Sequence, residues 1–502
     1  MDSVTNKAKI YSTRTALDDF FEQKIEFDIS VPDYNPSIHQ VLKCEVMPRV
    51  LSQSVTDDKA MLDVECLLRV LYADEQTGCI RSLCKTETFS KTLLLKHQLY
   101  PCKMRVNIKP VSVNCRVQNP RKLTVKAVIG AAVKIIGNNE IDIIDNITDD
   151  NIQAIFNKKC VNLFSGAGQT PTHIEGKLES KAPVCDVILS DATIVITDCK
   201  AVDDKIILKG MAEVCCIYLT GEQKGDMQIS KCSIPFSEVV DVEGAKESSY
   251  CDCHAAVNDI TCTVEDDGTT ISVAIDATVC AAVYNCVEIN LLQDVYSLTA
   301  ELKTTQSHKT IESLALNDTF LHNFTNEINC DFENARIVAV TGTPTIKGVR
   351  LSDGMLAIEG ELLTCIYMYN EEQYKIYEKT LPFTASHTAP DNTDSLRCEA
   401  SAILCDVSYS MPNDNTISIT ATVDIKLSCF AQNDLLVIDS FEYDPEKAHK
   451  KCKGLILYNA QKGEQLWDIA KKYHTSVNIL KRDNQIESDC VENPKMLLVS
   501  FN

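Results

Sequence analysis

The stretch Ile417-Ser418-Ile419-Thr420-Ala421-Thr422-Val423-Asp424 decides the fold, because its apolar and polar side chains alternate with period two. Successive side chains of a strand point to opposite faces, so the alternation predicts a strand with one buried and one solvated face. The turn-forming cluster Pro412-Asn413-Asp414-Asn415 precedes it, and a second apolar run begins before that cluster at Val407. Together these features predict a β-hairpin.

The same hairpin pattern occurs twice more. Phe89, Phe236 and Phe383 each precede Ser or Thr at a spacing of 147 residues, and a hairpin pattern begins 24 residues after each of them. The two earlier hairpins turn at Asn119-Pro120 and at Asp266-Asp267-Gly268. A fixed period indicates an internal repeat. We therefore expect a mainly β chain with three tandem antiparallel sandwich-like or barrel-like repeats over 1–145, 146–294 and 295–440.

Short, strand-like connections between the repeats suggest that they are strung as semi-rigid beads. The polar stretch 441–452, which holds Pro445 and several Lys and His residues, is expected to be a hinge. Gly166-Ala167-Gly168 lacks the context of a phosphate-binding loop and is interpreted as a flexible loop.

Residues 453–502 follow a different pattern, that of a small α+β module. Apolar runs predict strands at 455–458 and 496–499. Between them, one helix has apolar residues at helical spacing: Leu466, Ile469, Ala470 and Tyr473. Thr475 and Ser476 can cap a second helix. The expected order is strand, helix, helix, strand.

The charge of the chain is acidic and unevenly distributed. Its formal net charge is -22, although 453–502 contains seven basic and six acidic residues, so the acidic excess lies in 1–452. Such a chain would be repelled by nucleic acid and by anionic membrane surfaces. We see neither a secretory signal nor an apolar run long enough to insert in a membrane. The 24 cysteines are therefore expected to stay reduced in a cytosol, mostly as small buried side chains.

No pattern in the sequence indicates an enzyme or a bound cofactor. The best metal candidate is Cys251-Asp252-Cys253-His254, since thiolate and imidazole suit zinc, but a second Cys/His pair at matching spacing is missing. Cys251 and Cys398 are equivalent by the repeat offset, and so are Cys115 and Cys262. This equivalence favours structural positions over a metal site.

Several of these segments resemble known families. Val31-Pro32-Asp33-Tyr34-Asn35-Pro36-Ser37-Ile38 looks like the opening motif of the SPOCS domain, also called DUF3794. Later SPOCS landmarks are matched by 210–218, Ile234-Pro235-Phe236, Leu381-Pro382-Phe383 and Asp294-Val295-Tyr296-Ser297. Residues 453–502 resemble a LysM domain at Tyr458, Lys462-Gly463-Glu464, Leu466-Trp467-Asp468-Ile469-Ala470, Tyr473, Leu480, Asn484 and Pro494. Three SPOCS-like repeats closed by LysM are similar to SipL-type spore-coat morphogenetic proteins of clostridia.

The LysM resemblance implies a shallow groove, which in that family binds N-acetylglucosamine polymers. Here a partner- or glycan-binding groove would comprise Gly463, Glu464, Gln465, Leu466, Trp467, Asn484, Gln485, Ile486 and Glu487. Gln465 replaces the usual small hydroxyl residue, and Lys495 stands where the family favours glycine, which hinders close approach of a ligand. Trp467 and Tyr473 have an alternative role as core residues.

Two functions remain open. The resemblance implies a non-enzymatic adaptor in the mother-cell cytoplasm, at the forespore surface or spore coat. Its LysM module would dock the stage IV spore-morphogenetic ATPase, and its repeats would contact other coat proteins or further copies through edge strands. The alternative is a peptidoglycan- or N-acetylglucosamine-binding protein of the cell wall or spore cortex, which the missing export signal disfavours. A cysteine-rich metal or redox buffer ranks below both.

Overall fold

The computed structural model describes residues 5–56, 58–96, 99, 101–221, 227–329, 335–370, 373–391, 395–413, 415–449 and 454–500. Strands account for 81% of the structure and helices for 3%. All strand pairs between the named strands are antiparallel. The mainly β fold predicted from the alternating sequence is confirmed.

Each repeat forms a two-layered sandwich from six strands. In each case the first, sixth and fifth strands make one sheet, and the second, third and fourth make the other. The first repeat contains β1 (Thr5–Ser30), β2 (Ile38–Val55), β3 (Lys59–Asp74), β4 (Ile80–Leu94), β5 (Cys102–Asn119) and β6 (Lys122–Ile147). The second contains β7 (Ile152–Glu179), β8 (Asp186–Val202), β9 (Lys205–Leu219), β10 (Met227–Asp241), β11 (Tyr250–Val264) and β12 (Thr270–Ser297). The third contains β13 (Ala300–Asn329), β14 (Arg336–Ser352), β15 (Met355–Asn370), β16 (Gln373–Thr388), β17 (Leu396–Asn413) and β18 (Thr416–Ala448).

The predicted hairpins join the last two strands of each repeat. Asn119 pairs with Lys122 across the first turn, and Asn413 pairs with Thr416 across the third. The alternating residues of β18 that were expected to be buried, Ile417, Ile419, Ala421 and Val423, are at most 1% exposed. Burying one face of each sheet against the other removes these side chains from water, which is the main favourable contribution to folding.

The repeated phenylalanines mark the pairing of the third and fourth strands. Phe236 lies opposite Gly210 and Phe383 lies opposite Gly360, whereas Phe89 lies opposite Val64 in the first repeat. A Cβ atom at Gly360 would stand 2.2 Å from the Phe383 ring. The ring therefore occupies the space that a side chain on the neighbouring strand would need.

Gly166-Ala167-Gly168 is part of β7, so the interpretation of this segment as a flexible loop was wrong. A Cβ atom would lie 2.1 Å from the carbonyl oxygen of Glu243 at Gly166, and 2.0 Å from that of Asp241 at Gly168. These glycines allow close approach of two backbone segments, as glycine often does within strands.

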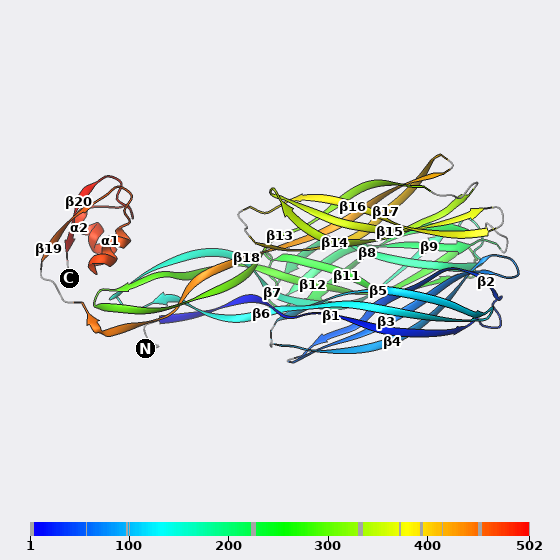
Figure 1. Cartoon of the computed structure of the whole chain (residues 1–502), viewed down its shortest axis with the longest axis horizontal. Helices are drawn as coiled ribbons and strands as arrows, with labels where there is room; N and C mark the ends of the chain where they lie inside the picture. Colours follow the sequence, from blue (N-terminus) through cyan, green and yellow to red (C-terminus); the bar gives the residue numbers. More distant parts are fainter. Residues whose placement is uncertain are drawn as a thin grey trace.

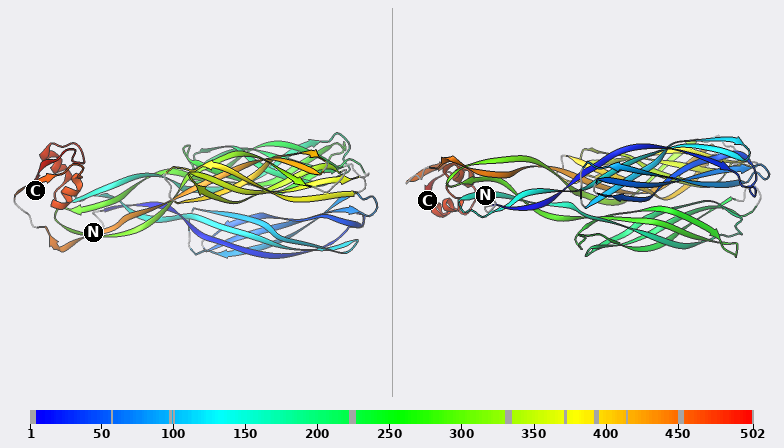
Figure 2. Two further views of the ribbon diagram at one scale, coloured as in Figure 1. Left: turned by 45° about the horizontal axis from the view of Figure 1, so that its top comes forward. Right: turned by 90° about the horizontal axis from the view of Figure 1, so that it is seen from below.

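The three repeats share a long stalk. The strand pairs β1–β6, β7–β12 and β13–β18 continue beyond their sandwiches as three ribbons that run together toward one end of the molecule (Figures 1 and 2). Each ribbon has a register shift on the way: between Thr15 and Leu17, between Val283 and Tyr284, and between Leu314 and Leu316. Such irregularities bend a strand pair and increase its twist.

Aliphatic side chains from all three ribbons form one core inside the stalk: Ile10, Ile143, Val161, Leu163, Ile289, Leu291, Ile311 and Val437. A further shared core lies between the sandwiches and includes Leu71, Ile217 and Tyr367. The expectation of beads on a string was therefore wrong, because each repeat buries apolar residues against the other two.

Next to the apolar stalk lies a charged junction of the three repeats. Arg105, Asp252 and Glu399 occupy equivalent positions, 147 residues apart, on β5, β11 and β17. Arg105 donates a hydrogen bond of 2.7 Å to Asp252 and another to Glu399. Lys103 and Lys426 also contact Asp252, the latter at 2.5 Å. One residue position is thus cationic in the first repeat and anionic in the other two, and Arg105 contacts both carboxylates.

Asp252 is only 2% exposed. Burial raises the pKa of its carboxyl, but Lys103, Lys426 and Arg105 outweigh burial and hold that pKa well below its ordinary value. Burial and the neighbouring cations lower the pKa of Lys103 to about 8, although Asp252 opposes this. The carboxylate is therefore ionised at neutral pH.

The hinge expected at 441–452 was placed too early, because β18 continues to Ala448. Lys303 of β13 forms an ion pair of 3.2 Å with Asp444 of β18, so this polar stretch belongs to the stalk. Residues 450–453 lie outside the described part of the chain. The connections between repeats, 148–151 and 298–299, fall a few residues after the boundaries expected at 145 and 294.

The C-terminal module consists of β19 (Leu455–Ala460), α1 (Leu466–Tyr473), α2 (Val477–Asn484) and β20 (Lys495–Ser500). The predicted strand, helix, helix, strand order is confirmed, as is the Ser476 cap, whose hydroxyl accepts from the Ile479 amide at 3.2 Å. Within the described residues, neither helix is long or apolar enough to span a bilayer. The module lies at the end of the stalk, far from the sandwiches (Figure 1).

Candidate functional site

The loop before α1 forms one rim of the expected groove and is hydrogen-bonded to the loop before β20. Gly463 has φ +89°, a left-handed conformation that glycine adopts readily. Its amide donates to the carbonyl of Val491 at 2.8 Å, and the Val491 amide donates to the carbonyl of Glu464 at 2.9 Å. Gln465 forms an isolated bridge with Cys490. Backbone hydrogen bonds between the two loops therefore hold the expected groove residues on this side in place.

The side chains of this rim divide into buried and accessible ones. Leu466 is fully buried in the module core, so its side chain is unavailable to a ligand. Glu464 accepts hydrogen bonds from the Tyr458 hydroxyl at 3.2 Å and from the Gln461 amide at 3.1 Å. Gly463 and Gln465 are exposed. The accessible part of the rim is therefore small and polar.

On the opposite side, Asn484 holds α2 to β20. Its amide nitrogen donates to the carbonyls of Leu480 at 2.9 Å and Leu498 at 2.8 Å, while its oxygen accepts from the Leu498 amide at 2.6 Å. The Asn484 amide is thus engaged within the module. Gln485 and Glu487 are exposed, and Ile486 is half-buried against the core.

Trp467 faces the stalk. Its indole Nε1 donates to Asp294 of β12 at 2.9 Å, and its ring packs edge-on against Tyr296 with centroids 4.8 Å apart. Lys471 forms an ion pair of 2.6 Å with the same Asp294. The Tyr296 hydroxyl donates to the carbonyl of Thr475 at 2.8 Å. Sequence reasoning singled out Asp294 and Tyr296 as part of a SPOCS landmark, but their pairing with the module required the structure.

These contacts change the titration of the stalk residues. Burial raises the pKa of Asp294, but the hydrogen bonds from Lys471 and Trp467 outweigh burial and lower it below its ordinary value. Burial raises the pKa of the Tyr296 hydroxyl. We call this contact between the module and the stalk the seat of the module. At neutral pH it consists of the Asp294 carboxylate, bound to the Lys471 ammonium group and the Trp467 indole, beside the neutral Tyr296 phenol.

The outer face of the β19–β20 sheet is apolar and uncovered. The helices pack on the opposite face, where Ile456, Tyr458, Leu497 and Val499 join the module core. On the outer face, Leu455 is 68% exposed, Leu457 67% and Met496 55%. Sequence reasoning missed this surface, although its signal was the uninterrupted run 455–458: a strand with one wet face should alternate with polar residues. Contiguous exposed apolar residues often mark interaction surfaces.

The metal site considered for Cys251-Asp252-Cys253-His254 does not form. In β11, Asp252 points toward the charged junction, whereas Cys251 and Cys253 pack into a core of the second repeat. Successive residues of a strand point to opposite faces, so the four side chains cannot converge on one ion. In the part of the chain that the structure describes, no group of three His, Cys, Asp or Glu residues has metal-binding geometry.

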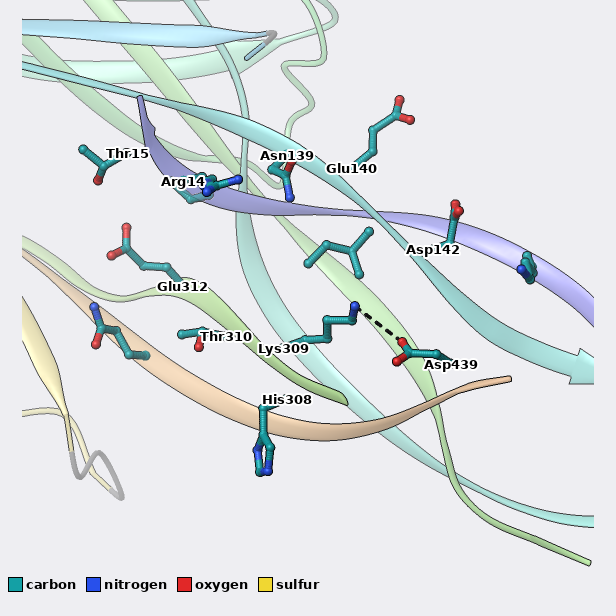
Figure 3. Close-up of a pocket in the computed structure, with 14 residues that line it drawn as sticks. Arg14, Thr15, Asn139, Glu140, Asp142, His308, Lys309, Thr310, Glu312 and Asp439 are labelled. Atoms are coloured by element: carbon teal, nitrogen blue, oxygen red, sulfur yellow. Dashed lines mark ion pairs between the residues drawn. The ribbon is translucent and has the colours of Figure 1, made fainter. Parts of the chain in front are cut away.

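A cleft of about 630 Å³ lies between the ribbons of the first and third repeats. Figure 3 shows side chains of both charges around it, among them Arg14, Glu140 and Asp142, and the ion pair between Lys309 and Asp439, 3.4 Å long. The mixture of charges gives the cleft no clear preference for an anion or a cation. We therefore assign it no ligand.

Comparison with known protein families supports the reading of both parts of the chain. The model of the SipL SPOCS domain matches residues 183–265, and that of the LysM domain matches residues 458–490. The chain therefore contains a SipL SPOCS domain and a C-terminal LysM domain, and the resemblance inferred from the sequence is confirmed. No curated protein and no solved structure matched the chain. Both domain families are non-catalytic, and the combination fits a sporulation-associated protein with a peptidoglycan-binding type of module.

Proposed function

We propose that this chain, with its SipL SPOCS and LysM domains, is a non-enzymatic adaptor for assembly of the spore coat. Its LysM module docks the stage IV spore-morphogenetic ATPase, and its three-repeat body contacts other coat proteins or further copies of the chain. The adaptor acts in the mother-cell cytoplasm, at the surface of the forespore.

One observation carries the proposal: the module presents an apolar sheet face at the tip of the stalk. Trp467 and Lys471 bind Asp294, so the α1 side of the module faces the stalk and the outer face with Leu455, Leu457 and Met496 is left uncovered. Apolar anchors surrounded by polar residues are the usual centre of a protein interface. A glycan would instead call for convergent polar groups.

The test is the affinity of the full-length chain for the purified ATPase. We expect Leu457→Glu to weaken binding by roughly tenfold or more, because it places a charge in a desolvated contact. The matched control is Leu321→Glu, since Leu321 is 65% exposed on β13 of the body. Equal affinity of the Leu457→Glu variant and the unchanged chain would refute docking through this face. Unchanged binding after deletion of 453–502 would refute docking through the module.

The alternative, binding of peptidoglycan or another N-acetylglucosamine polymer, is favoured by the LysM match itself. The residues of the expected groove that remain accessible are Gly463, Gln465, Gln485 and Glu487. Co-sedimentation with purified peptidoglycan distinguishes the two functions. Retention that is lost in a Gln465→Ala/Gln485→Ala variant but kept in Leu457→Glu would establish the glycan function instead.

The proposed location has its own test. A fluorescent fusion of the full chain in a sporulating cell should form a ring around the forespore. A signal over the vegetative cell wall would contradict the location and favour the glycan-binding alternative.

A further inference from the structure

Three thiols meet between the two sheets of the second repeat. Cys199 lies on β8, and Cys251 and Cys253 lie on β11, which belongs to the facing sheet. Cys199 and Cys251 pack against the hydrophobic core that contains Cys253. Cys253 is buried, whereas Cys199 and Cys251 are half-buried against the same core. Two of the three cysteines are thus partly accessible from the surface.

The strand that carries two of these thiols is also the strand at the charged junction. Asp252 lies between Cys251 and Cys253 and points the other way, toward Lys103, Arg105 and Lys426. Repeat three holds the backbone of the same segment: Asn317 donates to the carbonyl of Cys251 at 2.8 Å, and Lys426 donates to that of Cys253 at 2.5 Å. A covalent bond at these cysteines would therefore fix the strand that joins the repeats.

We propose that Cys199, Cys251 and Cys253 form a redox lock, in which oxidation by a low-molecular-weight disulfide joins Cys199 to one of the two β11 cysteines. A thiolate of the cluster attacks the small disulfide and expels one small thiol, forming a mixed disulfide. A neighbouring protein thiolate then attacks the protein sulfur of that mixed disulfide and expels the second small thiol. Two protein thiols are oxidised, one small disulfide is reduced to two thiols, and a disulfide connects the two sheets.

Three observations favour a redox site over inert packing. Both β11 cysteines pack in the same core as Cys199 on the facing sheet, and a disulfide between facing sheets is a known cross-link of β-sandwiches. Hydrogen bonds from Cys251 and Cys253 lower the pKa of Cys199 below its ordinary value, and the thiolate is the reactive form. A third thiol remains beside the bond and can exchange with it.

The experiment oxidises the folded full-length chain with glutathione disulfide, blocks the remaining thiols, and maps cross-linked peptides by mass spectrometry. We expect Cys199 linked to Cys251 or Cys253, linked only to Cys251 in Cys253→Ser, and only to Cys253 in Cys251→Ser. Oxidation should also raise the urea midpoint of the unchanged chain. Three results for Cys199 would overturn the proposal: recovery as a blocked free thiol, recovery only as a mixed disulfide with glutathione, or a link to another cysteine.

Two controls keep the test independent of folding and of other cysteines. Cys199→Ser and Cys199→Ala remove the lock, and circular dichroism shows which of the two variants folds. In the folded variant, oxidation should no longer produce the part of the increase in urea midpoint that is due to this cluster. Cys398 lies opposite Cys429 on the neighbouring strand, within one sheet of the third repeat. Cys398→Ser removes this thiol, so the cross-links of Cys199 should persist. One equivalent of zinc retained after dialysis, with all three thiols protected, would also overturn the proposal.

Discussion

The stalk core and the charged junction both hold the three repeats together, but they do so by opposite chemistry. In the stalk, each ribbon supplies similar aliphatic side chains, such as Ile143, Ile289 and Val437. At the junction, equivalent positions supply Arg105, Asp252 and Glu399. The apolar core favours association but distinguishes poorly between repeats, since the hydrophobic effect is non-directional. Unlike charges at equivalent positions can match in few arrangements, so the junction is suited to specify the order of the repeats.

The largest expected effect is that of breaking the junction. Asp252→Asn leaves the buried Lys103 and the half-buried Lys426 without their counter-charge, which should lower the free energy of unfolding by about 3–5 kcal/mol. Urea denaturation of the full chain measures it. The control is Asp259→Asn, which removes the more exposed ion pair between Arg49 and Asp259 and should cost at most about 1 kcal/mol. Equal costs for the two variants would contradict a special role of the junction.

In the stalk, Ile289→Ala should lower the free energy of unfolding by about 2–4 kcal/mol, because it leaves a cavity in a shared core. Ile289 is 1% exposed, whereas Leu436 of β18 is 55% exposed. Leu436→Ala therefore serves as the control and should change stability by no more than about 0.5 kcal/mol. If Ile289→Ala is as mild as the control, the three ribbons do not share a core in solution.

Acid should weaken the junction and spare the stalk core. The pKa of Asp252 is lower in the folded chain than in the unfolded one, so its contribution is complete at neutral pH and is lost as pH falls. An unfolded Asp takes up its proton at about pH 3.9. Below that pH, the Asp252 contribution to the free energy of unfolding should fall by about 1.4 kcal/mol per pH unit. The slope of stability against pH in this range should be shallower in Asp252→Asn than in the unchanged chain. Identical slopes would show that Asp252 titrates normally.

The smallest effect concerns the seat of the LysM module, which combines an ion pair with an aromatic contact. Asp294→Asn should weaken the seat by about 1 kcal/mol, since the ion pair with Lys471 is partly exposed. Trp467 is the only tryptophan, so its fluorescence reports directly on the contact. We expect emission to shift to the red in Asp294→Asn and to stay unchanged in the distant control Asp276→Asn. An unshifted Asp294→Asn spectrum would mean that the module does not rest on the stalk in solution.

Several features could be read from the residues alone because they depend on local periodicity. The alternation around Ile417 predicted strands, the 147-residue spacing of Phe89, Phe236 and Phe383 predicted three equivalent units, and the spacing of Leu466, Ile469 and Ala470 predicted a helix. The boundary of the hinge was misplaced because Pro445 and its charged neighbours resemble a linker. The pairing of Tyr443 with Leu302 and of Ala448 with Ala300, on either side of them, keeps this segment in the stalk.

The sequence by itself determined the alternating strands of the repeated hairpins, the turns within them, and the LysM character of the C-terminal module, because side-chain alternation and turn chemistry act over a few residues. Only the tertiary structure decided that the repeats share a stalk, that Asp252 meets cations from two other repeats, and that Trp467 packs against Tyr296. Those contacts join residues more than a hundred positions apart. Their partners are chosen by the packing of whole sheets, which no local pattern in the chain reveals.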